Sequence, residues 1–380
     1  MRHEPRAVTA RGGARRAFLR GGLAAVLAAR GAVAASPPRR PVLGAIRWDA
    51  WQAPGTPTTR AVERSLSPAP WRHRLPFFAE VAPDGTVAID GGRQEVMDRE
   101  IELAVEAGLG FWAFVAYPRE SPMSAGLRLY LASTQRRGLR FCMASELVQW
   151  GRAAQPSAEL LRWHAELLAH PDHMRTPAGR PLYFLGFMTE RLIAERWGGT
   201  DGLRDAVSAF RALAREAGAA DPYLVVMARP DPGAGFVRAI GADALGAYTI
   251  ADGRAADAPY SALAELAERR WDEMADTGVE VVPTAMAGWD RRPRVENPVP
   301  WEAWQRPGAG MDRFYHPGTA QEIAAHLRRC VDWVAARPSA APAGAALVYA
   351  WNENDEGGWL VPTLPFDDSR LKTLRRALPR

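Results

Sequence analysis

The sequence predicts a single (β/α)8 (TIM) barrel, an α/β fold in which eight parallel strands alternate with helices. Eight short apolar runs alternate along the chain with amphipathic stretches of helical period. Trp48-Asp49-Ala50-Trp51 follows the first run, where a nucleotide-binding open sheet would carry a glycine-rich turn. Two long connections follow the first and seventh runs, on the side of a barrel where active sites are built. An open doubly wound sheet is the alternative fold.

The expected strands are apolar through most of their length, which is typical of strands buried on both faces. They span residues 42–48, 109–117, 139–147, 181–187, 223–228, 244–250, 279–285 and 345–351. The polar ends of these runs define the rim of the predicted barrel.

Apolar positions three and four residues apart predict the intervening helices, the clearest of them over residues 323–334. Thr319 and Glu322 before it form the pattern of a capping box. Similar stripes occupy residues 97–105 and 263–274, and a short last helix is expected over residues 368–378.

The two long connections run over residues 49–92 and 286–317. The first contains an expected hairpin, with strands at 77–81 and 86–89 around Pro83-Asp84-Gly85. Long loops at the carboxyl ends of barrel strands usually cover a substrate groove, so we expect one here.

The excess of positive charge lies at the N-terminus. Seven arginines and one glutamate up to Ala35 contribute +6 to a net charge of +5, which leaves about −1 for the rest of the chain. The body therefore lacks the basic surface of a nucleic-acid-binding protein. No nucleic-acid partner is expected.

Residues 1–35 resemble a twin-arginine export signal. Arg15-Arg16 precede a mildly apolar stretch that ends in Ala32-Val33-Ala34, a small-x-small cleavage site. A basic amphipathic tail is the alternative. The signal predicts a periplasmic or secreted protein whose barrel domain occupies residues 36–380, with no membrane span after the signal is removed.

Cysteine and histidine give no sign of a disulfide framework or a metal centre. Cys142 and Cys330 lie in apolar contexts and are expected to be buried thiols. His164, His170 and His173 fall in one helical region, but they lack a further ligand at metal spacing. No metal and no organic cofactor is expected.

The eighth strand runs directly into Asn352-Glu353-Asn354-Asp355-Glu356. In a barrel this places Glu353 and Glu356 at the rim, beside the central cavity. Because two carboxylates in one pocket repel, one should keep its proton to higher pH and act as acid while the other stays ionised. Glycosidic bond cleavage needs this division, so we predict Glu353 and Glu356 as the catalytic pair. A solvated acidic turn is the alternative.

Aromatic and acidic residues follow most of the other strands and form a candidate sugar-binding ring, because a sugar presents apolar C–H faces and polar edges. An ion-paired loop is the alternative for the segment after the seventh strand. The candidate substrate-binding residues are Trp48, Asp49, Trp51, Tyr117, Glu146, Tyr248, Trp289, Asp290, Arg294 and Asn352.

These motifs resemble those of the endo-α-mannosidase clan, glycoside hydrolase families 99 and 71 with their WbsX-type relatives. Ala350-Trp351-Asn352-Glu353 with Glu356-Gly357, and Pro362 downstream, is similar to one signature, and Val282-Pro283 with residues 288–294 to another. Residues 108–114 look like the clan's second strand, and the likeness covers roughly residues 40–365.

The resemblance implies that Glu353 assists the sugar's own 2-hydroxyl as nucleophile. Glu356 would act as acid and then base, with retention through a 1,2-anhydro sugar. Asn354-Asp355 and Gly358 depart from the family pattern of Trp-His and Thr. Specificity for α-mannosides is therefore not implied.

The sequence thus predicts a glycoside hydrolase that retains configuration at α-linkages of a glycan or polysaccharide. A non-catalytic glycan-binding or polysaccharide-assembly protein is one alternative. A WbsX-type glycosyltransferase is another, although no glycine-rich loop or D-x-D pair supplies a donor-phosphate site.

Overall fold

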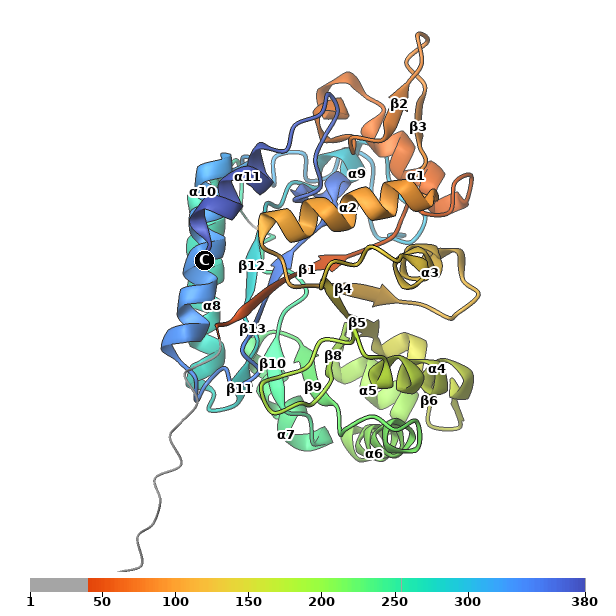
Figure 1. Cartoon of the computed structure of the whole chain (residues 1–380), viewed down its shortest axis with the longest axis vertical. Coiled ribbons are helices and arrows are strands. Elements are labelled where there is room, and N and C mark those ends of the chain that lie inside the picture. The colour runs from red at the N-terminus through yellow and green to blue at the C-terminus, as the bar shows by residue number, and fades with distance from the viewer. Residues whose placement is uncertain (1–39, 254, 380) are drawn as a thin grey trace, which may run out of the picture. The chain divides into compact units, whose positions relative to one another are not determined.

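Parallel strands form the centre of the structure, a computed structural model that describes residues 40–253 and 255–379 (Figure 1). The predicted export signal lies outside these residues. The central strands are β1 (Val42–Arg47), β4 (Phe111–Ala116), β5 (Arg140–Glu146), β8 (Leu182–Gly186), β9 (Tyr223–Met227), β10 (Ala244–Gly246), β11 (Glu280–Val281), β12 (Thr284–Met286) and β13 (Ala345–Tyr349).

These strands form the predicted eight-membered ring, because β11 and β12 are two parts of one barrel strand. Pro283 lies between them and has no N–H to donate, which interrupts the ladder. β11 pairs with β10, and β12 pairs with β13, which in turn pairs with β1. Backbone bonds from Val282 N to Leu245 O and from Leu347 N to Pro283 O, both 2.9 Å, join the segment to its two neighbours.

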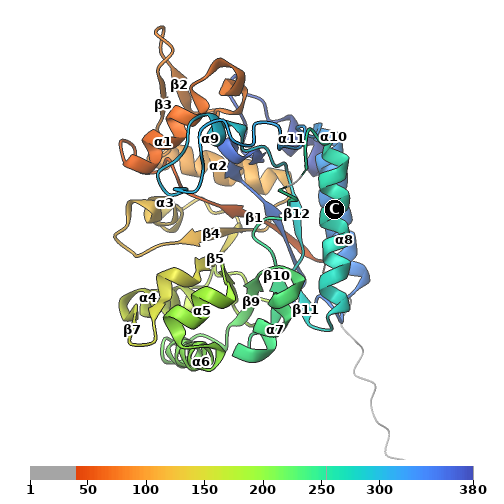
Figure 2. The same ribbon diagram turned by 180° about the vertical axis from the view of Figure 1, so that it is seen from behind.

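Helices surround the strands, and α8 and α10 lie side by side along one flank (Figures 1 and 2). The helices are α1 (Pro57–Leu66), α2 (Gln94–Ala107), α3 (Ala125–Ala132), α4 (Ala158–Ala169), α5 (Glu190–Trp197), α6 (Thr200–Glu216), α7 (Pro230–Ile240), α8 (Tyr260–Asp276), α9 (Arg292–Glu296), α10 (Ala320–Ala336) and α11 (Ser369–Ala377). The capping box is confirmed, since Thr319 and Glu322 each bond the other's backbone N–H at the start of α10.

Seven of the eight barrel strands end earlier than the sequence predicts, and the seventh ends one residue later, at Met286. The clearest case is β10, which ends at Gly246, although the apolar run continues to Ile250. Tyr248 and Thr249 in the remainder of the run line a pocket instead. Apolar character at these positions reflects burial against the rim rather than strand pairing.

The two long connections leave the same end of the barrel and are bonded to each other. The first contains α1, a 3₁₀ helix η1 (Ala69–Arg74) and the predicted hairpin, formed by β2 (Ala79–Val81) and β3 (Val87–Ile89). The second contains α9. Trp71 Nε1 donates to Glu296 Oε2 across 2.6 Å, and Arg74 forms a buried ion pair with Asp290. The loops therefore support each other above the strands.

Both cysteines are free and buried, as predicted, with Cys142 on β5 and Cys330 on α10. Burial raises the pKa of both thiols. No helix within residues 40–253 and 255–379 is long and apolar enough to cross a membrane.

Candidate active site

A pocket of about 480 Å³ opens at the carboxyl ends of the barrel strands, under the two long loops. Residues from nearly every connection on this face meet in it. Its lining includes the side chains of Trp48, Tyr117, Glu146, Gln149, Phe187, Tyr248, Trp289, Arg291, Arg294, Trp301, Glu302, Trp304, Glu353 and Glu356.

The two glutamates are positioned by a tight turn after β13. Asn352–Glu353 form the short strand β14, which pairs with β15 (Gly358–Trp359), and the 3₁₀ helix η4 (Asn354–Glu356) connects them. Gly357 ends this helix with φ of 85°, a left-handed conformation that favours glycine. A Cβ there would lie 2.4 Å from the backbone nitrogen of Asp290. The loops after the seventh and eighth barrel strands thus approach closely, and Asp290 N donates to Glu356 O at 2.7 Å.

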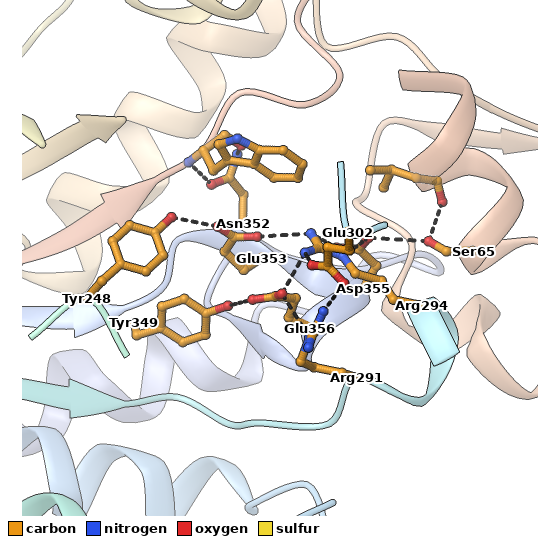
Figure 3. A network of polar contacts seen from close by, with 12 residues as sticks. Ser65, Tyr248, Arg291, Arg294, Glu302, Tyr349, Asn352, Glu353, Asp355 and Glu356 are labelled. Atoms are coloured by element: carbon orange, nitrogen blue, oxygen red, sulfur yellow. Dashed lines mark hydrogen bonds and ion pairs between the residues drawn. The ribbon is translucent and has the colours of Figure 1, made fainter. Parts of the chain in front are cut away.

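Glu353 is buried and has two polar partners. Tyr248 donates its phenol proton to Oε1 at 2.8 Å, and Arg294 Nη2 lies 3.4 Å from Oε2 (Figure 3). Burial, followed by the charges of Glu356 and Asp355, raises the pKa of Glu353 to about 8, against the opposing effects of Arg294 and the tyrosine. The pair of glutamates therefore retains one proton at neutral pH, as the sequence predicted for two carboxylates in one pocket.

Glu356 accepts three hydrogen bonds, from Arg291 Nε at 3.0 Å, Arg294 Nη1 at 2.5 Å and the hydroxyl of Tyr349 (Figure 3). A carboxylate can accept all three, whereas a carboxyl proton would compete with these donors. In the free site the shared proton accordingly lies on Glu353. This distribution is the reverse of the roles that the family resemblance implied.

Arg294 connects the acidic groups of the site. Its buried guanidinium bonds Asp355 at 2.7 and 3.0 Å and contacts both glutamates and Glu302. Asp355 is therefore buried and paired rather than facing solvent. These acidic neighbours raise the pKa of Arg294 well above its ordinary value, in spite of the opposing effect of burial.

Aromatic rings cover the arginines on the solvent side. The guanidinium of Arg294 lies 5.2 Å from the ring of Trp48 and 5.7 Å from that of Trp301. Arg291 lies 5.8 Å from Trp289 and 5.0 Å from Trp304. The pocket thus combines carboxylates with exposed aromatic faces, which together suit a sugar ring.

The structure brings six of the predicted substrate-binding residues to this pocket: Trp48, Tyr117, Glu146, Tyr248, Trp289 and Arg294. Trp48 Nε1 donates to the hydroxyl of Tyr117 at 2.9 Å, which fixes both rings at the rim. Burial raises the pKa of Glu146.

The other four predicted residues lie outside the pocket and make buried contacts. Asp49 pairs with Arg47 at 2.8 Å, and Trp51 packs against Phe78. Asp290 is bonded to Arg74 and Arg292. Asn352 holds Trp48 through bonds to its backbone, 2.9 Å to N and 2.7 Å to O. Each of these residues is close in sequence to a residue that lines the pocket, but its own side chain makes the buried contacts described above.

The pocket lining also includes residues that were not among the predicted binders, among them Gln149, Phe187, Arg291, Trp301, Glu302 and Trp304. The sequence carried one signal for part of this set, because Trp301 and Trp304 fall in the long loop expected to cover a groove. No comparable signal marked Phe187, whose left-handed backbone is visible only in the structure.

No group of three or more potential ligands, drawn from His, Cys, Asp and Glu, could hold a metal ion in the described parts of the chain.

Comparisons with known proteins support the fold. No family model and no curated protein matches the chain. A structure of the family 99 endo-α-mannosidase from Bacteroides thetaiotaomicron matches with a TM-score of 0.51 and 12% identity, covering 88% of this chain and 96% of that one. A second structure of that enzyme matches with a TM-score of 0.50 and 13% identity, covering 88% and 98%. The chain has the same barrel fold, which confirms the resemblance at that level.

Proposed function

We propose that the protein is a glycoside hydrolase that acts on an α-linked glycan or polysaccharide, with Glu353 and Glu356 as its acid and base. The observation that carries the proposal is a buried pair of glutamates that retains one proton at neutral pH, in a pocket lined by exposed aromatic rings. The barrel shared with a family 99 endo-α-mannosidase supports it.

The raised pKa of Glu353 and the two guanidiniums on Glu356 support the acid role for Glu353. This residue would protonate the leaving oxygen, and Glu356, held by two guanidiniums, would serve as the carboxylate that stabilises or deprotonates the attacking group. The retaining outcome that the resemblance implies is part of the proposal. A proton NMR spectrum of the first product formed should show the α-anomer before mutarotation, whereas the β-anomer would establish inversion.

The experiment that tests the proposal is a screen of polymeric α-glycans and α-mannans for released reducing ends. The full chain is compared with the Glu353→Gln and Glu356→Gln variants, which keep the shape of each side chain and remove its charge. Glu280→Gln, at the opposite end of the barrel in β11, is the matched control. We expect release by the unmodified and control proteins and loss in both pocket variants.

Other outcomes favour the alternative functions. Turnover at the unmodified rate in both pocket variants would show that the pair is not catalytic. Glycan binding without product, unaffected by either change, would favour a binding or assembly protein. Donor-dependent extension of a glycan would favour a glycosyltransferase.

We also propose that residues 1–35 direct the chain out of the cytoplasm by the twin-arginine route. Replacing Arg15 and Arg16 with lysines in the full chain should retain the protein in the cytoplasmic fraction. Unchanged export of that variant would contradict the proposal.

A further inference from the structure

A second hollow, of about 770 Å³, adjoins the active-site pocket on the same face of the barrel. Sites for small ligands have volumes of about 300–1,000 Å³, so it is large enough to hold one. The segments that follow β8, β9 and β10 form its walls, and it shares Phe187, Tyr248 and Thr249 with the first pocket. A glycan bound at Glu353 and Glu356 can therefore extend into the second hollow.

Phe187 forms the boundary between the two hollows. Its side chain is 50% exposed, and its ring centroid lies 5.0 Å from that of Tyr248, the residue that bonds Glu353. Its φ of 56° is a conformation that a bulky residue rarely adopts and that costs free energy. Such conformations concentrate at functional sites. The exposed ring offers an apolar face of the kind that stacks on the C–H face of a sugar.

The two hollows differ in charge. Four glutamates and two arginines line the active-site pocket, namely Glu146, Glu302, Glu353, Glu356, Arg291 and Arg294. The second hollow is lined by Arg229, Arg270 and Asp252. Arg270 is bonded to Glu273 at 2.6 Å. An anionic group on a substrate is repelled by the excess of glutamates in the first pocket, whereas arginines outnumber acids among the side chains that line the second hollow.

Arg229 is the cation best placed to bind such a group. It lies two residues after the end of β9 and is exposed, and its side chain forms no hydrogen bond or ion pair with another residue in the described ranges. A guanidinium binds carboxylate, sulfate and phosphate groups through parallel N–H donors. Binding a ligand there would not require breaking an existing ion pair of that side chain.

We propose that the second hollow is a subsite for a neighbouring sugar unit that carries a carboxylate, sulfate or phosphate group. Phe187 stacks on the ring of this unit, and Arg229 binds its anionic substituent. The inference rests on the proposed function, since it takes the bound molecule to be a glycan. It makes the substrate an acidic polysaccharide whose charged units lie beyond the cleaved bond rather than at it.

Affinity gel electrophoresis tests the subsite without requiring cleavage. The probes are dextran, carboxymethyl dextran and dextran sulfate, which share an α-linked backbone and differ in charge. All variants are made in the Glu353→Gln background. We expect stronger retardation by the charged polymers than by dextran. Arg229→Gln should remove that difference, with an apparent affinity roughly tenfold lower (about 1.4 kcal/mol).

Two further variants make the result specific. Phe187→Ala should weaken retardation by neutral and charged polymers alike. Arg376→Gln makes the same change of charge on the exposed side of α11 and should leave retardation unchanged. Equal loss in the Arg376 and Arg229 variants would show non-specific attraction and overturn the proposal, as would equal retardation by charged and neutral polymers.

Separate experiments test the proposed subsite and the proposed hydrolase activity. Release of reducing ends without Arg229-dependent binding would leave the hydrolase and remove the subsite. Arg229-dependent binding without any cleavage would support the subsite but indicate a glycan-binding protein instead of a hydrolase.

Discussion

Tyr248 and Glu353 are joined by a hydrogen bond of 2.8 Å between the phenol and Oε1. The bond links the segment after β10 to the segment after β13, so it depends on closure of the barrel. The same tyrosine packs against Phe187 and lines both hollows. The residue that contacts the proposed acid therefore also forms the wall along which a substrate would extend.

Replacing Tyr248 with phenylalanine should move the alkaline limb of the activity profile to higher pH. The phenol donates to the ionised form of Glu353 and so lowers its pKa, against the larger effects that raise it to about 8. Without the donor, the pair should keep its proton to a pH higher by on the order of one unit. The measurement is kcat/KM against pH.

Tyr223→Phe is the matched control for this variant. Tyr223 begins β9, away from the pocket, and its hydroxyl also donates to a glutamate, Glu280. An alkaline limb that stays in place in Tyr248→Phe would show that Glu353 does not control it.

Much of this architecture can be predicted from sequence. The strands are continuous apolar runs, and the capping residues Thr319 and Glu322 mark the start of α10. The spacing of apolar residues and the local capping chemistry therefore locate the helices and strands. The direct step from an apolar strand into Glu353 and Glu356 likewise places the pair at the rim. These features depend on residues close together in the sequence, so they can be recognised from a single sequence.

The remaining features depend on contacts between distant segments. Asp49 and Asp290 carry the same charge as the pocket glutamates, but each pairs with an arginine beneath the rim. Arg291 comes to lie on Glu356 because glycines allow the two loops to approach closely. Nothing in the local pattern distinguishes an acid that faces the pocket from one that faces a buried guanidinium.

Substrates with good leaving groups should separate the roles of the two glutamates. A glycosyl fluoride needs no protonation at departure, so loss of the acid affects it little, whereas loss of the base or nucleophile abolishes its hydrolysis. We expect Glu353→Gln to hydrolyse the α-fluoride of the sugar found in the screen and Glu356→Gln to fail. The opposite pattern would restore the roles that the family resemblance implied.

Arg294→Met should destabilise the fold as well as the site. The guanidinium is buried among Glu353, Asp355 and Glu356. Its loss leaves the buried Asp355 without its cationic partner and leaves Glu356 with only one of its two guanidiniums. Breaking a buried ion pair typically costs about 3–5 kcal/mol. The measurement is the free energy of unfolding in urea. Arg191→Met, which removes an exposed ion pair with Glu195, should change it by less than about 1 kcal/mol. Equal effects of the two changes would mean that the buried cluster contributes little to stability.

Asp49 should make stability depend on pH in a direction opposite to that of an ordinary paired carboxylate. Burial raises its pKa from 3.8 to about 6, more than the pairing with Arg47 lowers it. The folded state therefore holds this proton more tightly than the unfolded chain does. Its contribution to stability is fully present below about pH 4 and is lost as the pH rises through 6.

Urea unfolding of the unmodified protein and of Asp49→Asn at pH 4 and pH 7 measures this contribution, because the other titrating groups are common to both. The advantage of the unmodified protein should be larger at pH 4, by on the order of 3 kcal/mol. Asp201→Asn, at an exposed position, should show no such change. If the difference between the two proteins were the same at both pH values, Asp49 would be ionised throughout, and the attraction of Arg47 would outweigh the cost of burial.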